Sequence, residues 1–188
     1  MLDWKELKDA CNRCSRCGLC QTRKYVVFGV GNENADILFV GEGPGEQEDL
    51  QGEPFVGPAG KLLDDMISII DLDRKANCYI ANIVKCRPPM NRDPMETEQD
   101  ACIGFLENQI ALIRPKILVC LGRVAAKRLI DPEYRITKQH GQWIEKEGIW
   151  MTAIYHPSAL LRDLSKRPET FRDLLSIRDK IRELGIEL

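Results

Sequence analysis

The sequence predicts an α/β protein, a three-layer α/β/α sandwich with a short central, mainly parallel four-stranded sheet. Two observations lead to this prediction. Short apolar runs alternate along the chain with segments of helical apolar spacing, which is the order of a parallel sheet with crossover helices. The apolar runs also end in Gly, Asn or His, and ligands in such folds bind where strands pass into loops.

The expected strands are 36–40, 78–86, 116–122 and 149–157, and the expected helices are 4–14, 57–72, 94–113, 123–130 and 169–184. The segment "HPSALLRDLSKRP" (156–168) between the last strand and the last helix is expected to be a loop. The first strand, "DILFV", is an uninterrupted apolar run followed by glycines, which is typical of a strand buried on both faces. The expected helix 57–72 has apolar residues at helical spacing, namely Leu62, Leu63, Met66, Ile67 and Ile70. Pro94 and the acidic residues after it suit the start of the next helix, where the helix dipole favours negative charge.

Composition limits the kind of protein further. The chain has 188 residues, of which 44% are hydrophobic, enough for one compact domain. Its net charge of −2 indicates no general affinity for nucleic acid, so DNA binding would need a local basic face. We expect no membrane span, because no apolar stretch is long enough. The charged N-terminus lacks the apolar core of a signal peptide, so we expect a cytoplasmic protein.

The eight cysteines are the first chemical signal. In the reducing cytosol they indicate metal ligands rather than disulfides. Four of them, Cys11, Cys14, Cys17 and Cys20, form a C-x2-C-x2-C-x2-C run. Zinc and iron–sulfur clusters both accept four thiolates, so the run alone leaves the metal open. It lacks the proline that follows the last cysteine of ferredoxin-type runs.

Three further segments carry candidate ligand-binding residues. The glycine-rich stretch "GEGPGEQEDLQGEPFVGPAGKLLD" (41–64) allows close backbone approach to a ligand, although a tight strand-to-helix turn explains it equally well when it is taken alone. Asn82 lies in an otherwise apolar strand and must satisfy a donor and an acceptor. His156 lies at a strand end before a proline. We expect Glu42, Gly43, Asn82 and His156, together with a glycine after the third strand, to converge on one pocket.

Five motifs occur in order: "GEGPGEQED" (41–49), "GEPFVGPAGKLLD" (52–64), "NIVKCRPPMNRDP" (82–94), "LGRVAA" (121–126) and "YHPSALLR" (155–162). Together they resemble family 4 uracil-DNA glycosylases, the iron–sulfur branch of the uracil-glycosylase superfamily. The resemblance runs from about Cys14 to Arg162. It implies a DNA repair enzyme that flips uracil out of DNA and hydrolyses its N-glycosidic bond. The implied partner is uracil-containing DNA, and we expect a monomer.

The resemblance also implies roles for individual residues. His156 would donate to uracil O2 as negative charge builds on the leaving base, and Asn82 would pair with the O4 and N3–H edge. Phe55 would stack on the flipped base, and Gly43 would line the pocket. Glu42 is the candidate for positioning the attacking water.

Further residues are expected around this pocket. Glu48 would fill the space beside C5 and so exclude thymine. Two basic clusters are predicted to bind phosphate. One follows the second strand and contains Lys85, Arg87 and Arg92, and the other follows His156 and contains Arg162, Lys166 and Arg167. Leu160 and Leu161 are the candidate wedge that fills the gap left by the flipped base, on condition that they are exposed.

For the metal, the resemblance implies a [4Fe-4S] cluster on Cys14, Cys17, Cys86 and Cys102. We expect residues 1–188 to form a single domain, in which this cluster would tie the N-terminal segment 1–24 to the body. The role of the cluster would be structural. Cys78 and Cys120, in apolar strands, are expected to be inert core thiols, and Cys11 and Cys20 are left unassigned.

Three other interpretations stay open from the residues. One is an iron–sulfur electron carrier, and another is a zinc-binding nucleic-acid module without catalysis. A third is the related branch that traps uracil DNA covalently, but that branch has a histidine where Cys86 stands here.

Overall fold

The computed structural model describes residues 2–188 and has a six-stranded sheet with the order β1-β3-β2-β4-β6-β5. The strands are β1 (Val30–Gly31), β2 (Ile37–Gly41), β3 (Cys78–Asn82), β4 (Ile117–Leu121), β5 (Ile144–Lys146) and β6 (Ile149–Ile154). The inner four are parallel, and β1 and β5 pair antiparallel at the two edges. The predicted sandwich is confirmed, but the expected count of four strands omitted both edges. β5 is exposed at all three residues, so it carries no apolar pattern from which it could be recognised.

Eight α-helices surround the sheet in the described part of the chain. They are α1 (Trp4–Asn12), α2 (Glu46–Gln51), α3 (Pro58–Ser68), α4 (Glu96–Ile113), α5 (Arg123–Leu129), α6 (Ile136–Gln139), α7 (Pro157–Arg162) and α8 (Arg167–Glu183). The segment after His156, expected to be a loop, is the short helix α7, because Pro157 occupies its first turn, where a missing N–H costs nothing. None of the helices in residues 2–188 is long and apolar enough to cross a bilayer.

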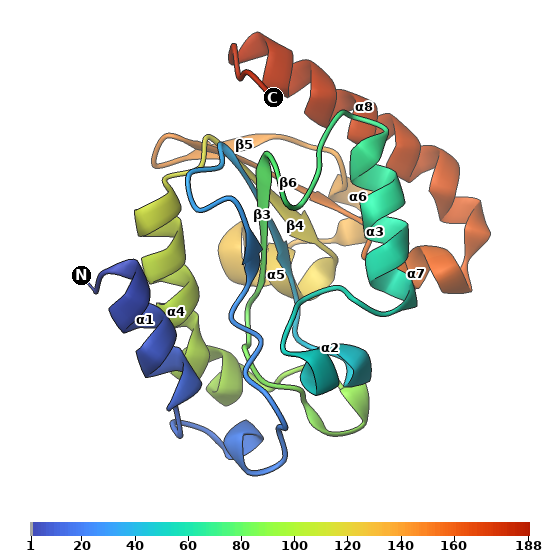
Figure 1. The fold of residues 1–188 in the computed structure, drawn as a ribbon. Coiled ribbons are helices and arrows are strands. Elements are labelled where there is room, and N and C mark those ends of the chain that lie inside the picture. Colours follow the sequence, from blue (N-terminus) through green and yellow to red (C-terminus); the bar gives the residue numbers. More distant parts are fainter. Residues whose placement is uncertain (1) are drawn as a thin grey trace.

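Helices cover both faces of the sheet (Figure 1), and an apolar layer lies between the helices and each face. In β2, Ile37 and Phe39 face one layer with α3, α7 and α8, while Leu38 and Val40 face the other with α1, α4 and α5. This alternation follows from the period of two in a strand. Since each strand feeds both layers, β2, β3 and β4 are fully buried, as their largely apolar sequences predict.

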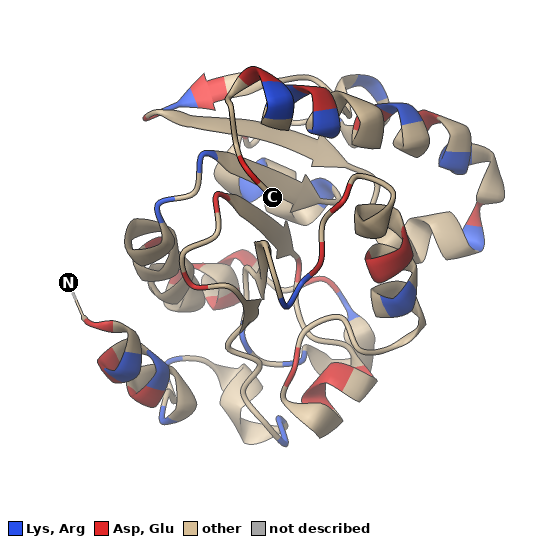
Figure 2. Ribbon diagram, turned by 45° about the horizontal axis from the view of Figure 1, so that its top comes forward, with Lys and Arg blue, Asp and Glu red and all other residues tan. Residues whose placement is uncertain are grey.

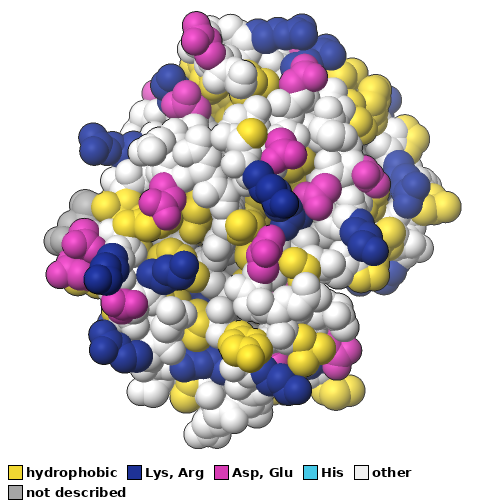
Figure 3. Space-filling model, in the orientation of Figure 1, with side chains coloured by type: hydrophobic (Ala, Val, Ile, Leu, Met, Phe, Trp, Pro, Cys, Tyr) yellow, Lys and Arg dark blue, Asp and Glu magenta, His cyan; other side chains and the backbone are white. Residues whose placement is uncertain are grey.

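The surface carries charges of both signs in close mixture. Basic and acidic residues alternate along α8 (Figure 2), and the face seen in Figure 3 likewise shows Lys and Arg next to Asp and Glu. This matches the small net charge of −2. A DNA-binding surface must therefore come from a local set of residues.

The sheet order fixes where a ligand would bind. The chain leaves β2 toward β3 on one side and later places β4 on its other side, so strand order reverses at β2. In open α/β sheets, the crevice at the carboxyl ends of the strands beside such a reversal is the usual ligand site.

Candidate active site and cysteine cavity

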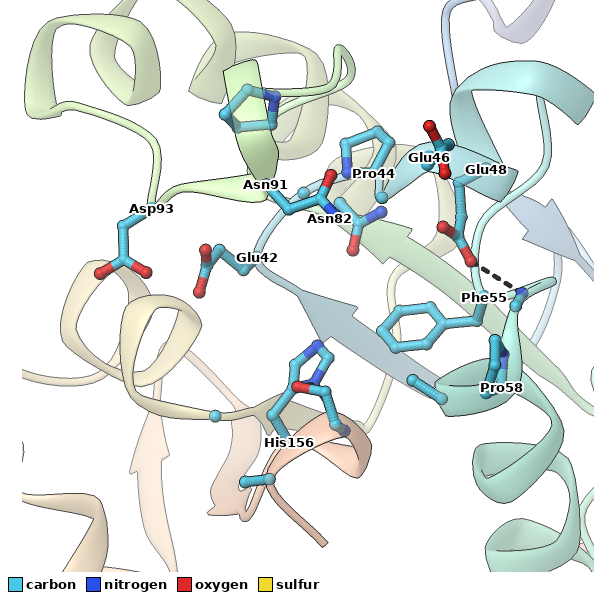
Figure 4. A pocket seen from close by; sticks show the side chains of 18 of the residues that line it. Glu42, Pro44, Glu46, Glu48, Phe55, Pro58, Asn82, Asn91, Asp93 and His156 are labelled. Atoms are coloured by element: carbon cyan, nitrogen blue, oxygen red, sulfur yellow. Dashed lines mark hydrogen bonds between the residues drawn. The ribbon is translucent and has the colours of Figure 1, made fainter. Parts of the chain in front are cut away.

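A pocket of about 530 Å³ opens at the carboxyl ends of the parallel strands. Its lining includes Glu42 and Gly43 after β2, Asn82 at the end of β3, Gly122 after β4 and His156 after β6. The expected convergence of these strand ends is confirmed. Figure 4 shows Glu42, Asn82, Phe55 and His156 arranged around the same hollow.

Asn82 is buried, and its side-chain oxygen Oδ1 has no hydrogen-bond partner among the described residues. It lies opposite Gly41 in the register of β2 and β3. A Cβ at Gly41 would stand 2.4 Å from Oδ1 and 2.6 Å from Cζ of Phe55, so only glycine leaves room for both side chains. A buried acceptor without a partner is costly, which indicates that this oxygen is kept for a ligand donor.

Phe55 forms one wall of the pocket in a left-handed backbone conformation, with φ of 54°. Its ring centroid lies 5.6 Å from that of His156, with the planes tilted by 31°. The buried guanidinium of Arg74 donates to the carbonyl oxygens of Pro54 and Phe55, each at 2.8 Å, and holds this conformation. Gly60 allows the turn, because a Cβ there would come 1.9 Å from the Phe55 carbonyl oxygen.

His156 is the N-cap of α7. The backbone N–H of Ser158 donates to its Nδ1 at 3.1 Å, and the Ser158 hydroxyl lies 2.8 Å from the same nitrogen. Burial lowers the pKa of His156 to about 4, helped by the positive charge of Arg162 and opposed by Glu48. The ring is therefore neutral near pH 7. Because Nδ1 accepts, its single proton is on Nε2, which makes that nitrogen the available donor.

Glu42 forms an acidic pair with Asp93 at the pocket edge, where Figure 4 shows their carboxyl groups facing one another. Burial raises the pKa of Glu42 to about 7, and Asp93 adds to the rise through its negative charge and a hydrogen bond, while Arg123 opposes it. Asp93 is itself ion-paired with Arg123. Sequence reasoning missed Asp93 and Arg123; the only signal was their place inside the motifs "NRDP" and "LGRVAA".

Glu48 and Gly43 complete the glycine-rich side. Glu48 Oε1 accepts the backbone N–H groups of Val56 at 2.9 Å and Gly57 at 3.0 Å, so this carboxylate holds the Phe55 loop against α2. The side chain also lines the pocket. A Cβ at Gly43 would lie 2.7 Å from Val84 Cγ2, which explains the need for glycine there.

Two of the predicted DNA contacts do not fit the structure. Lys85 is 1% exposed, and its Nζ donates to Gln109 Oε1 at 2.6 Å inside the protein, so it cannot contact phosphate. Leu160 is 2% exposed and packs in the layer of α3 and α8, which removes it from the wedge. Leu161, with 43% of its area exposed, stays available.

The other predicted basic residues differ in what they contact. Arg162 lines the pocket. Arg87 donates to Asn91 Oδ1 at 2.7 Å and lies 3.6 Å from a Glu46 carboxylate oxygen. Arg92 makes a two-point contact with the buried carboxylate of Glu98, at 2.8 and 2.7 Å, which fixes it to the start of α4.

A second, small cavity gathers six of the eight cysteines. Its lining contains Cys11, Cys14, Cys17, Cys20, Cys86 and Cys102. Cys11, left unassigned from the sequence, is 1% exposed and belongs to this group. Cys78 and Cys120 are fully buried in strands away from it.

Backbone and side-chain donors already point at the sulfurs of this cavity. The N–H of Lys85 donates to Cys102 Sγ and Arg23 Nη1 donates to Cys86 Sγ, both at 3.3 Å. Burial raises the pKa of the Cys86 thiol to about 11, and Arg23 opposes the rise. No three Cys, His, Asp or Glu side chains in residues 2–188 stand close enough to hold one metal ion. A [4Fe-4S] cluster takes one thiolate per iron, so its four cysteine sulfurs do not have to meet at a single ion.

The comparisons with known proteins agree with this fold and pocket. A family model described as the Uracil DNA glycosylase superfamily matches residues 28–177, a range that holds every strand and the whole pocket. The chain therefore belongs to the uracil-DNA glycosylase superfamily.

Within the superfamily, three relatives called Type-4 uracil-DNA glycosylase are especially similar. The one from Archaeoglobus fulgidus is 46% identical over 176 residues, covering 89% of this chain and 86% of the relative. The one from Sulfurisphaera tokodaii is 44% identical, covering 97% and 84%, and the one from Thermotoga maritima is 43% identical, covering 85% and 83%. The chain is a member of the Type-4 uracil-DNA glycosylases.

Proposed function

We propose that the protein is a monomeric, cytoplasmic DNA repair enzyme that flips uracil out of DNA, hydrolyses its N-glycosidic bond and leaves an abasic site. Family membership supports the reaction class. The observation that carries the assignment to uracil is the pairing, in one pocket, of an unsatisfied acceptor on Asn82 with an available donor on His156.

His156 acts on the leaving group. The bond between the base nitrogen N1 and the sugar carbon C1′ breaks, and its electron pair leaves with uracil as an anion. The neutral imidazole donates from Nε2 to O2, where part of this charge gathers, and keeps its proton. A neutral donor suits the low pKa of about 4.

Asn82 reads the base. Its free Oδ1 accepts from N3–H, and its amide nitrogen donates to O4. Cytosine would offer a bare nitrogen to Oδ1 and an amine to the amide, leaving buried groups unpaired on both sides. The Phe55 ring stacks on the flipped base, and Glu48 fills the space that the thymine methyl would need.

Glu42 positions the water. As a carboxylate, it accepts a hydrogen bond from the water that attacks C1′ of the cationic sugar, and it takes the proton released. Asp93 lies beside Glu42 and raises its pKa, while Arg123, the ion-pair partner of Asp93, lowers it.

The DNA contacts are assigned to residues near the rim. Arg162 and Arg87 contact phosphates, and the exposed Leu161 enters the gap left by the flipped nucleotide. Lys85 and Leu160 have no place in this set.

A [4Fe-4S] cluster on Cys14, Cys17, Cys86 and Cys102 is part of the proposal. These four cysteines belong to three parts of the chain, the segment after α1, the loop after β3 and helix α4. The cluster joins them. Its contribution is structural, because hydrolysis transfers no electrons.

The test uses paired oligonucleotides. The purified protein is incubated with a strand containing one uracil and with the same strand containing thymine, and both are then cleaved with alkali. We expect cleavage at uracil alone, and an Asn82→Asp variant with the same circular dichroism spectrum should lose most of it. Intact uracil strands would refute the enzyme assignment, and full activity of the variant would refute the role of Asn82.

A further inference from the structure

We propose that the buried ammonium of Lys85 is the counter-charge of the iron–sulfur cluster and sets how firmly the cluster is held. The inference rests on the proposed cluster, but it concerns a residue that the resemblance implied to be a DNA contact.

Lys85 is incompletely paired inside the protein. It is 1% exposed, and its three N–H donors have one acceptor, Gln109 Oε1 at 2.6 Å. No carboxylate in residues 2–188 forms an ion pair with it. A buried charge is normally paired, because removing it from water is expensive. The fold therefore leaves Lys85 in need of an anion.

Gln109 cannot meet this need by itself. It is fully buried, and its amide nitrogen donates to the Phe28 carbonyl at 3.0 Å and lies 3.4 Å from the Tyr79 hydroxyl. These contacts fix the amide so that its oxygen faces Lys85. The amide accepts one hydrogen bond from the ammonium, but it carries no charge to balance it.

The cysteine cavity supplies the missing charge. Lys85 lines this cavity, and its own backbone N–H donates to Cys102 Sγ at 3.3 Å. The described lining residues include three basic ones, Arg16, Arg23 and Lys85, and no acidic one. Such a lining is unusual in a chain of net charge −2, and it suits an anionic occupant. A cluster bound by four thiolates is such an anion.

Arg23 and Lys85 come from different parts of the chain, the N-terminal segment and the loop after β3. Arg23 donates to Cys86 Sγ at 3.3 Å and to the Cys14 carbonyl at 2.7 Å, and it is only partly buried. Water can screen Arg23 but not Lys85, so we assign the larger effect to Lys85.

A simpler role for Lys85 is a structural hydrogen bond to Gln109. The two roles differ in what Lys85→Met does. If the cavity held no anion, Met would replace an unbalanced buried charge by an apolar side chain of similar length, a change that is often neutral or stabilising. If the cavity holds an anionic cluster, the same change removes its counter-charge.

The experiment compares wild type, Lys85→Met and Gln109→Met as purified, cluster-loaded proteins. Gln109→Met is the matched control, since it removes the same hydrogen bond and keeps the ammonium. Three quantities are measured: iron and sulfide per chain, the rate of iron release to a chelator, and the midpoint potential of one-electron reduction at an electrode.

We expect Lys85→Met to release iron on the order of tenfold faster than wild type, as for other groups that support metal ligands from the second layer. Its midpoint potential should become more negative, because a nearby positive charge favours the reduced cluster. Gln109→Met should stay near wild type. A Lys85→Met protein that contains no iron, but has the circular dichroism spectrum of chelated wild type, also supports the proposal.

The proposal would be overturned if Lys85→Met had the iron release rate and midpoint potential of wild type. It would also be overturned if Gln109→Met changed these two quantities as much as Lys85→Met does. Wild type without iron would overturn both the cluster and the counter-charge, while uracil release by the same sample would show that the proposed enzyme activity stands independently.

Discussion

The backbone N–H of Ser158 donates to Nδ1 of His156 at 3.1 Å, which leaves the proton of the neutral imidazole on Nε2, the one nitrogen available to a ligand. The ring thus caps helix α7 with one nitrogen and offers the other to the pocket.

Replacing His156 by Ala should reduce uracil release by about 10²–10³-fold, the usual cost of one donor to a developing anion. Single-turnover rates measure the loss. Ser158→Ala is the control, because it keeps the backbone N–H on Nδ1 and should retain most activity. A His156→Ala protein that works at the wild-type rate would show that the leaving base is stabilised elsewhere.

Gly41→Ala tests the tight packing beneath the base. The added methyl would stand 2.4 Å from Asn82 Oδ1 and 2.6 Å from Phe55 Cζ, so it must displace one of them. We expect uracil excision to fall by at least about tenfold, since small misplacements of positioning groups are costly. Gly104→Ala, where a Cβ would meet nothing within 4 Å, should leave excision unchanged. Equal rates for the two variants would contradict the tight fit.

The pH profile should follow Glu42. Its pKa is raised to about 7, so the carboxylate that positions water forms as pH rises through 7, and activity should rise with it. His156, with its pKa of about 4, is neutral across this range and does not limit the rate. Asp93→Asn removes the neighbouring negative charge, which should move the acid limb to lower pH without abolishing it, because burial is the larger cause. Rate constants from pH 5 to 9 test this prediction. If the acid limb of Asp93→Asn lies at the same pH as that of wild type, Asp93 does not raise the pKa of Glu42.

Serine at Cys86 should abolish the cluster, because serine is a poor ligand for iron in such sites. Iron content and visible absorbance give the result. Cys120→Ser changes a fully buried cysteine outside the cavity and should keep the cluster if the variant folds. Loss of iron on changing Cys11 or Cys20, with Cys86→Ser unaffected, would show that the ligand set is different.

Leu161→Ala should weaken excision from duplex DNA more than from single strands, because only a duplex leaves a gap to fill. The effect is measured as the ratio of the two rates. Leu164→Ala provides a comparison, since Leu164 is even more exposed, at 61%, but lies beyond the end of α7, the helix that carries Leu161. If Leu161→Ala leaves the ratio of the two rates unchanged, Leu161 does not fill the gap left by the flipped nucleotide.

Much of the fold was predictable from sequence, since β2, β3 and β4 are buried on both faces and have largely apolar sequences. The convergence of Asn82 and His156 followed from parallel strands sharing one carboxyl edge. Lys85 and Leu160 were misassigned because motif position does not reveal which way a side chain turns. Lys85 points inward to Gln109 on α4, and Leu160 lies on the buried side of a helix that was expected to be a loop. Asp93 escaped notice because its partner Arg123 lies 30 positions away.

The hydrogen bonds from Arg74 to the turn that carries Phe55 affect how a base would bind in the pocket. Two carbonyl oxygens of the Phe55 turn are bound by a guanidinium that is itself buried and bound to Asp64 at 2.7 Å. The stacking surface is thus oriented when the chain folds, and little conformational entropy of the ring is lost on binding. A rigid wall adapts poorly to a larger base, so from the proposed role of Phe55 we expect the discrimination against purines to exist before any base binds.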